Sequence, residues 1–136
     1  MIETIITAVE ARDMIGYTLE GHVEECSTAF DCTPPTVGVI MAALAGELSP
    51  LARGVLLQTL WFVSGCDAGP EEECRRQVQE GFWRLLEIGL TGDADDAETV
   101  ADICESMALG GAKSAFYQAE LRERVRARTK RRSRSV

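Results

Sequence analysis

Residues 71–109 constrain the possible folds of this chain most strongly, because their pattern predicts two helices joined by a short acidic turn. Over 71–91 and 94–108, apolar residues return every three to four positions, which places them on one stripe of each predicted helix. These positions are Cys74, Val78, Phe82, Leu85 and Gly89 in the first helix, and Val100, Ile103, Cys104 and Met107 in the second. Neither helix can bury its stripe alone, so each needs a neighbouring helix.

The same periodicity predicts further helices on both sides of this pair. Helices are expected over 34–47 and 50–64, with Thr33 and Ser49 as N-caps in front of prolines and Gly65 ending the second helix. A last helix is expected from residue 112 past residue 125. Near the N-terminus, one bent helix or two would carry Ile2, Ile5, Ile6, Val9, Ile15, Leu19, His22, Val23, Cys26 and Phe30 on one side.

Length and charge divide the chain into a body and a tail. At 136 residues, the chain has the length of one domain. Residues 1–120 hold 21 acidic and 6 basic side chains, a net charge of −15, whereas residues 121–136 have a net charge of +7. We therefore predict a single helical domain over 1–121 and a basic, disordered tail over 122–136. An acidic body repels nucleic acid and attracts basic partners.

The sequence shows neither a membrane span nor a signal peptide, and this bears on the expected state of the cysteines. It has no apolar run of membrane-spanning length and does not begin like a signal peptide, which predicts a cytoplasmic protein. The five cysteines are then expected to be reduced thiols, with a Cys66–Cys74 disulfide as the alternative in an oxidising setting. They are Cys26, Cys32, Cys66, Cys74 and Cys104.

A weak internal repeat appears when the chain is shifted against itself by 44 residues. Ser49 then aligns with Asp93 as a second N-cap, and apolar positions align in pairs: Met41 with Leu85, Leu56 with Val100, Leu60 with Cys104, and Val63 with Met107. Two helices in such a period lie in the range of HEAT and armadillo repeats. The segment 92–101 resembles the acidic turn between the helices of a HEAT-like repeat, and 30–40 resembles the proline-marked entry to a helix.

The resemblance to HEAT-like and armadillo-like helical-repeat proteins covers roughly residues 22–109, judged by the repeat period. It implies an all-α fold of stacked antiparallel helix pairs, an α-solenoid, and a role as a binding scaffold. The chain departs from the family pattern because the usual arginine in the second helix of each unit is missing. Only two clean units are visible. The rival architecture is a compact six- or seven-helix bundle.

Acidic side chains are the candidate partner-binding residues. The expected docking surface for a basic protein consists of Asp93, Asp95, Asp96, Glu98 and Asp102 together with Glu71, Glu72 and Glu73. Their spacing is not that of a calcium loop, and capping of helix N-termini is the plainer reading of the same charges. His22 lacks the paired cysteines of a zinc site, even with Cys26 and Cys32 nearby. We expect no catalytic residue, metal or cofactor.

A second hypothesis uses the large aromatic residues. A pocket for a small molecule would be lined by Trp61, Phe62, Phe82, Trp83 and His22. Adjacent helical residues point about 100° apart, so one member of each aromatic pair is expected to be exposed or to line a groove. The acidic surface remains the basis of the leading hypothesis, a non-enzymatic protein-binding module of the kind that neutralises a basic toxin. The alternative is a small helical enzyme or accessory protein, and nucleic acid would bind only through residues 122–134.

Overall fold

The computed structural model describes residues 1–14, 19, 22–25 and 28–134. Contacts between residues divide the chain into two compact units, Met1–Gly81 and Phe82–Val136. Seven α-helices lie in the part of the chain that is described, and the only strands there are two residues long each. The all-α class predicted from the periodicity is therefore confirmed.

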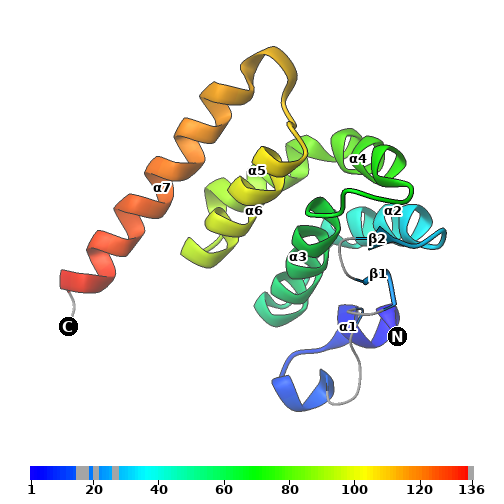
Figure 1. Cartoon of the computed structure of the whole chain (residues 1–136). Coiled ribbons are helices and arrows are strands. Elements are labelled where there is room, and N and C mark those ends of the chain that lie inside the picture. The colour runs from blue at the N-terminus through cyan, green and yellow to red at the C-terminus, as the bar shows by residue number, and fades with distance from the viewer. Residues whose placement is uncertain (15–18, 20–21, 26–27, 135–136) are drawn as a thin grey trace. The chain divides into compact units, whose positions relative to one another are not determined.

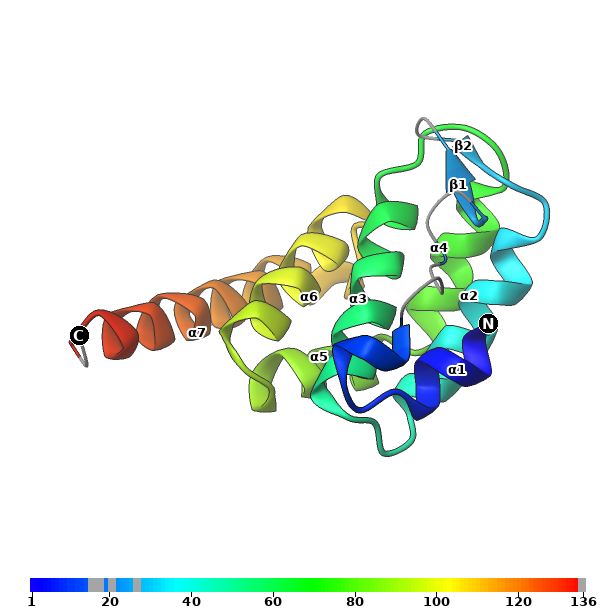
Figure 2. The same cartoon turned by 90° about the horizontal axis from the view of Figure 1, so that it is seen from below.

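In its described residues, the first unit contains four α-helices, and two of them pack against α2. Helix α2 (Thr33–Leu44) lies against both α3 (Pro50–Ser64) and α4 (Glu71–Glu80), and α1 (Ile2–Thr7) packs on α3 (Figure 2). A short 3-10 helix, η1, spans Ala11–Met14. Most of the apolar residues that the sequence predicts for these helices face this core, but Val9 lies beyond α1 and is 71% exposed. The fully buried side chains of the core include Ile5, Val37, Ile40, Leu44, Leu56, Leu60 and Val78.

The stretch before α2 is not the helix that the periodicity predicts. In it, β1 (Glu24–Glu25) pairs antiparallel with β2 (Thr28–Ala29). The Thr33 hydroxyl accepts the Phe30 N–H at 2.9 Å and donates to the Val23 carbonyl, which closes the hairpin. These tertiary hydrogen bonds satisfy backbone groups that a helix would have paired locally. The positions predicted at Ile15 and Cys26 lie outside the described residues.

Of the two N-caps predicted for the first unit, one forms and the other is replaced by tertiary hydrogen bonds. Ser49 caps α3 as predicted, because its hydroxyl accepts the Ala52 N–H at 3.0 Å. Gly65 follows the last residue of α3, also as predicted. Thr33 is not the cap of α2. It is the first residue of that helix, and its buried hydroxyl is already used by the hairpin.

Gly81 interrupts the helix that the spacing predicts over 71–91. The chain forms α4 up to Glu80 and a new helix, α5 (Phe82–Thr91), after it. Glycine is a poor helix former, and this one also makes room for α2. A Cβ built on Gly81 would lie 2.2 Å from Cε of Met41. The break coincides with the boundary between the two units.

The second unit consists of α5, α6 (Ala94–Ser106) and α7 (Ser114–Arg134). Helix α6 packs against both of the others, and α5 also contacts α7 (Figure 1). Asp93 and Asp96 form a capping box, in which each carboxylate accepts the backbone N–H of the other residue. The predicted N-cap at Asp93 is confirmed. Between α6 and α7, three residues have positive φ: Ala108, Gly110 and Gly111. Gly111 is also the first residue of a short 3-10 helix, η2 (Gly111–Lys113).

Helix α7 continues to Arg134, although the composition predicts disorder from residue 122. Part of the reason is that α5 and α6 supply contacts to α7 as far as Arg128. Leu121 is completely buried, and Arg128 donates to the Leu90 carbonyl at 3.4 Å. A basic segment that would not be helical alone gains these tertiary contacts.

The 44-residue shift aligns the starts of one pair of helices, whereas the helix predicted over 78–91 for the other pair is broken at Gly81. Helices α3 and α6 begin at Pro50 and Ala94, 44 positions apart. Every aligned apolar pair is buried on both sides: Met41 and Leu85, Leu56 and Val100, Leu60 and Cys104, Val63 and Met107. The register of the repeat thus agrees with burial, while HEAT-like stacking stays a prediction.

Candidate functional site

Four carboxylates follow the solvent side of α6 and form what we call the acidic stripe: Asp95, Glu98, Asp102 and Glu105. Their spacing of three, four and three residues places them on one face of the helix. The other side of α6 is buried, at Ala97, Val100, Ala101 and Cys104. Burial of one face therefore fixes the direction in which the stripe points. Glu105 is a member that the sequence reasoning missed.

Arg122 of α7 occupies the C-terminal half of the acidic stripe. One of its guanidinium nitrogens lies 2.7 Å from Oδ1 of Asp102 and 2.8 Å from Oε2 of Glu105. Hydrogen bonds to Asp102 and Glu105 raise the pKa of the Arg122 guanidinium further above its already high value. Arg122 therefore remains charged, and a single cation is shared between two carboxylates.

The N-terminal half of the stripe is open. Asp95 and Glu98 are exposed, and neither forms an ion pair with a residue that the structure describes. Asp93 and Asp96, which the sequence also nominates for partner binding, serve the capping box instead, and Asp96 is only 5% exposed. The predicted cluster thus separates into two capping carboxylates, two exposed carboxylates without an ion pair to a described residue, and Asp102, which is already paired with Arg122.

Glu71, Glu72 and Glu73 lie on the first turn of α4, in the other unit. Glu72 pairs with Arg75 at 2.6 Å, and Glu73 pairs with Arg76 at 2.5 Å. Hydrogen bonds from these arginines lower the pKa values of both carboxyl groups. Residues three apart on a helix are neighbours, so the pairing is local. Two of the three charges are therefore partly neutralised within their own helix.

The aromatic residues also fall in two units. Trp61 and Phe62 pack edge to face on α3, and His22 is an exposed residue of the same unit. Phe82 and Trp83 join Tyr117 of α7, with ring centroids 5.3 to 5.6 Å apart. One member of each pair is more exposed, as predicted: Trp61 at 39% and Trp83 at 66%, while Phe82 is buried. Of the five predicted pocket residues, His22, Trp61 and Phe62 thus belong to the first unit, and Phe82 and Trp83 belong to the second.

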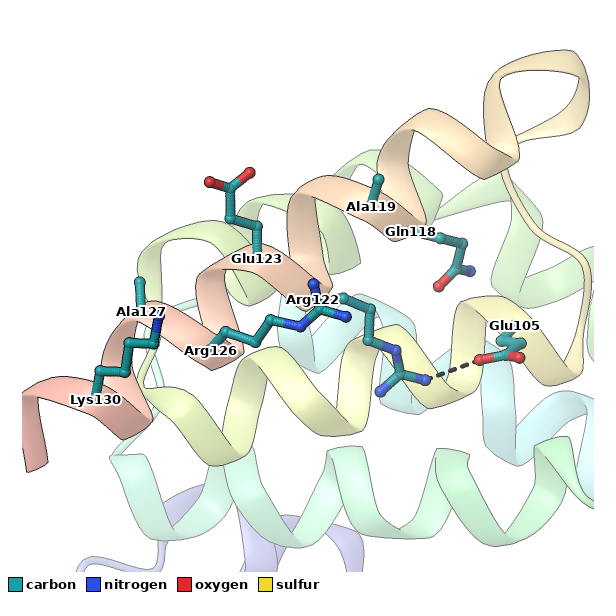
Figure 3. A pocket seen from close by; sticks show the side chains of 8 residues that line it. All are labelled: Glu105, Gln118, Ala119, Arg122, Glu123, Arg126, Ala127 and Lys130. Atoms are coloured by element: carbon teal, nitrogen blue, oxygen red, sulfur yellow. Dashed lines mark hydrogen bonds and ion pairs between the residues drawn. The ribbon is translucent and has the colours of Figure 1, made fainter. Parts of the chain in front are cut away.

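An open groove lies beside α7, with a volume of about 840 Å³ (Figure 3). Figure 3 shows Arg122 reaching across to Glu105 of α6 at one end of it. The lining residues are Glu105, Gln118, Ala119, Arg122, Glu123, Arg126, Ala127 and Lys130. The sequence contains a signal for this groove, because Arg122, Arg126 and Lys130 recur every fourth residue.

Cys32, Cys66, Cys74 and Cys104 are free thiols. Within the described ranges, no three His, Cys, Asp or Glu side chains lie close enough to hold a metal ion. Within the same ranges, no helix combines the length and apolar character needed to span a membrane. Comparisons with protein-family models, curated proteins and solved structures return no match.

Proposed function

We propose that this chain is a non-enzymatic binding module that docks a basic protein through the acidic stripe of α6. The supporting observation is the pairing of Arg122 with both Asp102 and Glu105. This contact within the chain illustrates the geometry in which the stripe holds a guanidinium group. The exposed carboxylates of Asp95 and Glu98 continue the same face and offer that arrangement to another molecule.

The spacing of the stripe defines the partner's chemistry. Asp95 and Glu98, the open pair of the stripe, are three residues apart, which corresponds to about 4.5 Å along the helix axis. A partner would therefore present arginine or lysine side chains at a similar interval, on a helix or an extended loop. Arginine suits the site best, because its planar guanidinium forms paired hydrogen bonds with carboxylates.

Charge on this scale contributes more to the rate of association than to affinity. An exposed ion pair contributes about 0.2–1 kcal/mol, so Asp95 and Glu98 alone give only weak binding. The net charge of −8 nevertheless attracts a basic partner over a distance and accelerates the encounter. Rapid capture of a basic protein is what a toxin-neutralising partner requires.

The test is affinity capture with the full chain and two matched variants. Asp95→Asn with Glu98→Gln removes the open half of the stripe, and Glu3→Gln with Glu47→Gln removes two exposed charges elsewhere. Each protein is immobilised and exposed to lysate at low and at high salt. Retained proteins are then identified and their net charges compared.

The wild-type chain and the Glu3/Glu47 variant should retain the same basic protein at low salt and release it at high salt. The Asp95/Glu98 variant should lose most of it. Equal retention by all three proteins, or retention that resists high salt, would contradict docking through the acidic stripe. Failure to retain any basic protein would count against the proposed function itself.

A further inference from the structure

The solvent side of α7 carries a row of cations at every fourth residue: Arg122, Arg126, Lys130 and Arg134. Arg126, Lys130 and Arg134 are exposed, and Arg126 and Lys130 line the groove beside α7 (Figure 3). Arg122 is held by the acidic stripe, so the other three form what we call the cationic row. None of these three forms an ion pair with a described residue.

The row is linear, and a linear array selects a linear anion. Successive members are about 6 Å apart along the helix axis, so the row from Arg126 to Arg134 extends for about 12 Å. A compact anion would leave part of the row without a partner. Double-stranded DNA, in contrast, presents a negative charge about every 3.4 Å along each strand. Guanidinium groups also match phosphate oxygens in pairs.

We propose that the C-terminal half of α7 binds the phosphate backbone of double-stranded nucleic acid without sequence preference. A helix with side chains is about 10–12 Å across, which is close to the width of the major groove of B-DNA. Phosphate contacts position a protein on a duplex but carry no sequence information. The side chains that read base edges are not required for this mode of binding.

An acidic protein surface and an anionic lipid surface both fit the helix less well than a nucleic-acid duplex does. Protein interfaces depend on buried aromatic and apolar anchors, and residues 126–134 contain no large apolar residue. For the same reason, this segment has no apolar face to insert into a lipid surface. It also has no aromatic side chain on which unpaired bases could stack, which favours a duplex over a single strand.

The remainder of the chain limits the affinity. Residues 1–120 have a net charge of −15 and repel phosphate. Binding is therefore expected at low ionic strength and should weaken steeply as salt is added. Each phosphate contact contributes about 0.9 to the slope of log K against log salt concentration for B-DNA.

The test uses the full chain and a fluorescently labelled DNA duplex, with anisotropy measured over a range of salt concentrations. The variant Arg126→Gln/Lys130→Gln/Arg134→Gln removes the cationic row. The control Arg12→Gln/Arg75→Gln/Arg76→Gln removes the same number of positive charges from the other unit, so the net charges match. Circular dichroism spectra of all three proteins would check that each variant is folded.

The wild-type chain and the control should bind the duplex with similar affinity and similar salt slopes. The cationic-row variant should bind at least tenfold more weakly, with a slope reduced by about 2 to 3 for the three lost contacts. No binding at low salt, or equal binding by both triple variants, would overturn the proposal. Tighter binding to polyglutamate or to anionic lipid vesicles than to the duplex would also overturn it. The acidic stripe is intact in all three proteins, so failure here leaves the proposed function untouched.

Discussion

Leu121 of α7 packs directly over Gly89 of α5. A Cβ built on Gly89 would lie 2.6 Å from Cδ2 of Leu121, and Cγ1 of Val100 in α6 would be 3.1 Å away. Leu121 and Val100 are both completely buried. The missing side chain at Gly89 thus allows three helices to approach one point, and this contact anchors the basic helix to the rest of its unit.

Replacement of Gly89 with alanine should destabilise the second unit. Alanine is the better helix former by about 1 kcal/mol, but the added methyl group must displace Leu121 at a cost of about 1–3 kcal/mol. We expect a lower melting temperature, measured by circular dichroism. Gly54→Ala is the matched control, because a Cβ there meets nothing within 4 Å. It should leave stability unchanged or raise it, and a stabilised Gly89→Ala variant would contradict the packing described.

The Asp93 carboxylate should contribute to stability through its cap on α6. It accepts the Asp96 N–H at 2.8 Å, so Asp93→Ala leaves that donor without its partner. Loss of such a cap costs about 1 kcal/mol, which urea denaturation would detect. Glu98→Ala, on the exposed side of the same helix, should change stability by less than about 0.5 kcal/mol. Equal losses in both variants would mean that the cap is not the source of the effect.

Two buried thiols should make stability fall in alkaline solution. Burial raises the pKa of Cys74 to about 11 and that of Cys104 to about 12, from 9.0. Above pH 9, the unfolded chain therefore loses thiol protons that the folded chain retains. Each thiol then contributes a loss of about 1.4 kcal/mol per pH unit, up to its own folded pKa.

Urea denaturation between pH 8 and pH 11 would measure this slope. In Cys104→Ala, the loss of stability above pH 9 should be smaller than in the wild-type chain, whatever the stability at pH 8. Val100→Ala shortens a buried side chain of the same helix without removing a thiol, and it should keep the wild-type slope. An unchanged slope in the Cys104 variant would show that this thiol is not protected by burial.

The candidate site was only partly predictable from the sequence. The alternation of apolar and polar residues on α6 indicates which carboxylates face solvent, and the N-cap at Asp93 is a local signal. The separation of capping carboxylates from exposed ones depends on the geometry of the turn. Arg122 contacts carboxylates 17 and 20 residues earlier in the chain, and no local pattern encodes that pairing.

By itself, the sequence determined the all-α class, the helix starts at Pro50 and Ala94, and the burial of the aligned apolar pairs. The class and the helix starts depend on interactions within a few residues, and the period of the apolar residues marks the face of each helix that must be buried. Only the tertiary structure decided the hairpin closed by Thr33, the helical state of the basic segment and the occupation of the acidic stripe by Arg122. Each depends on contacts between distant parts of the chain, which no local pattern describes. At Gly81, a contact with Met41 adds to the poor helix propensity of glycine.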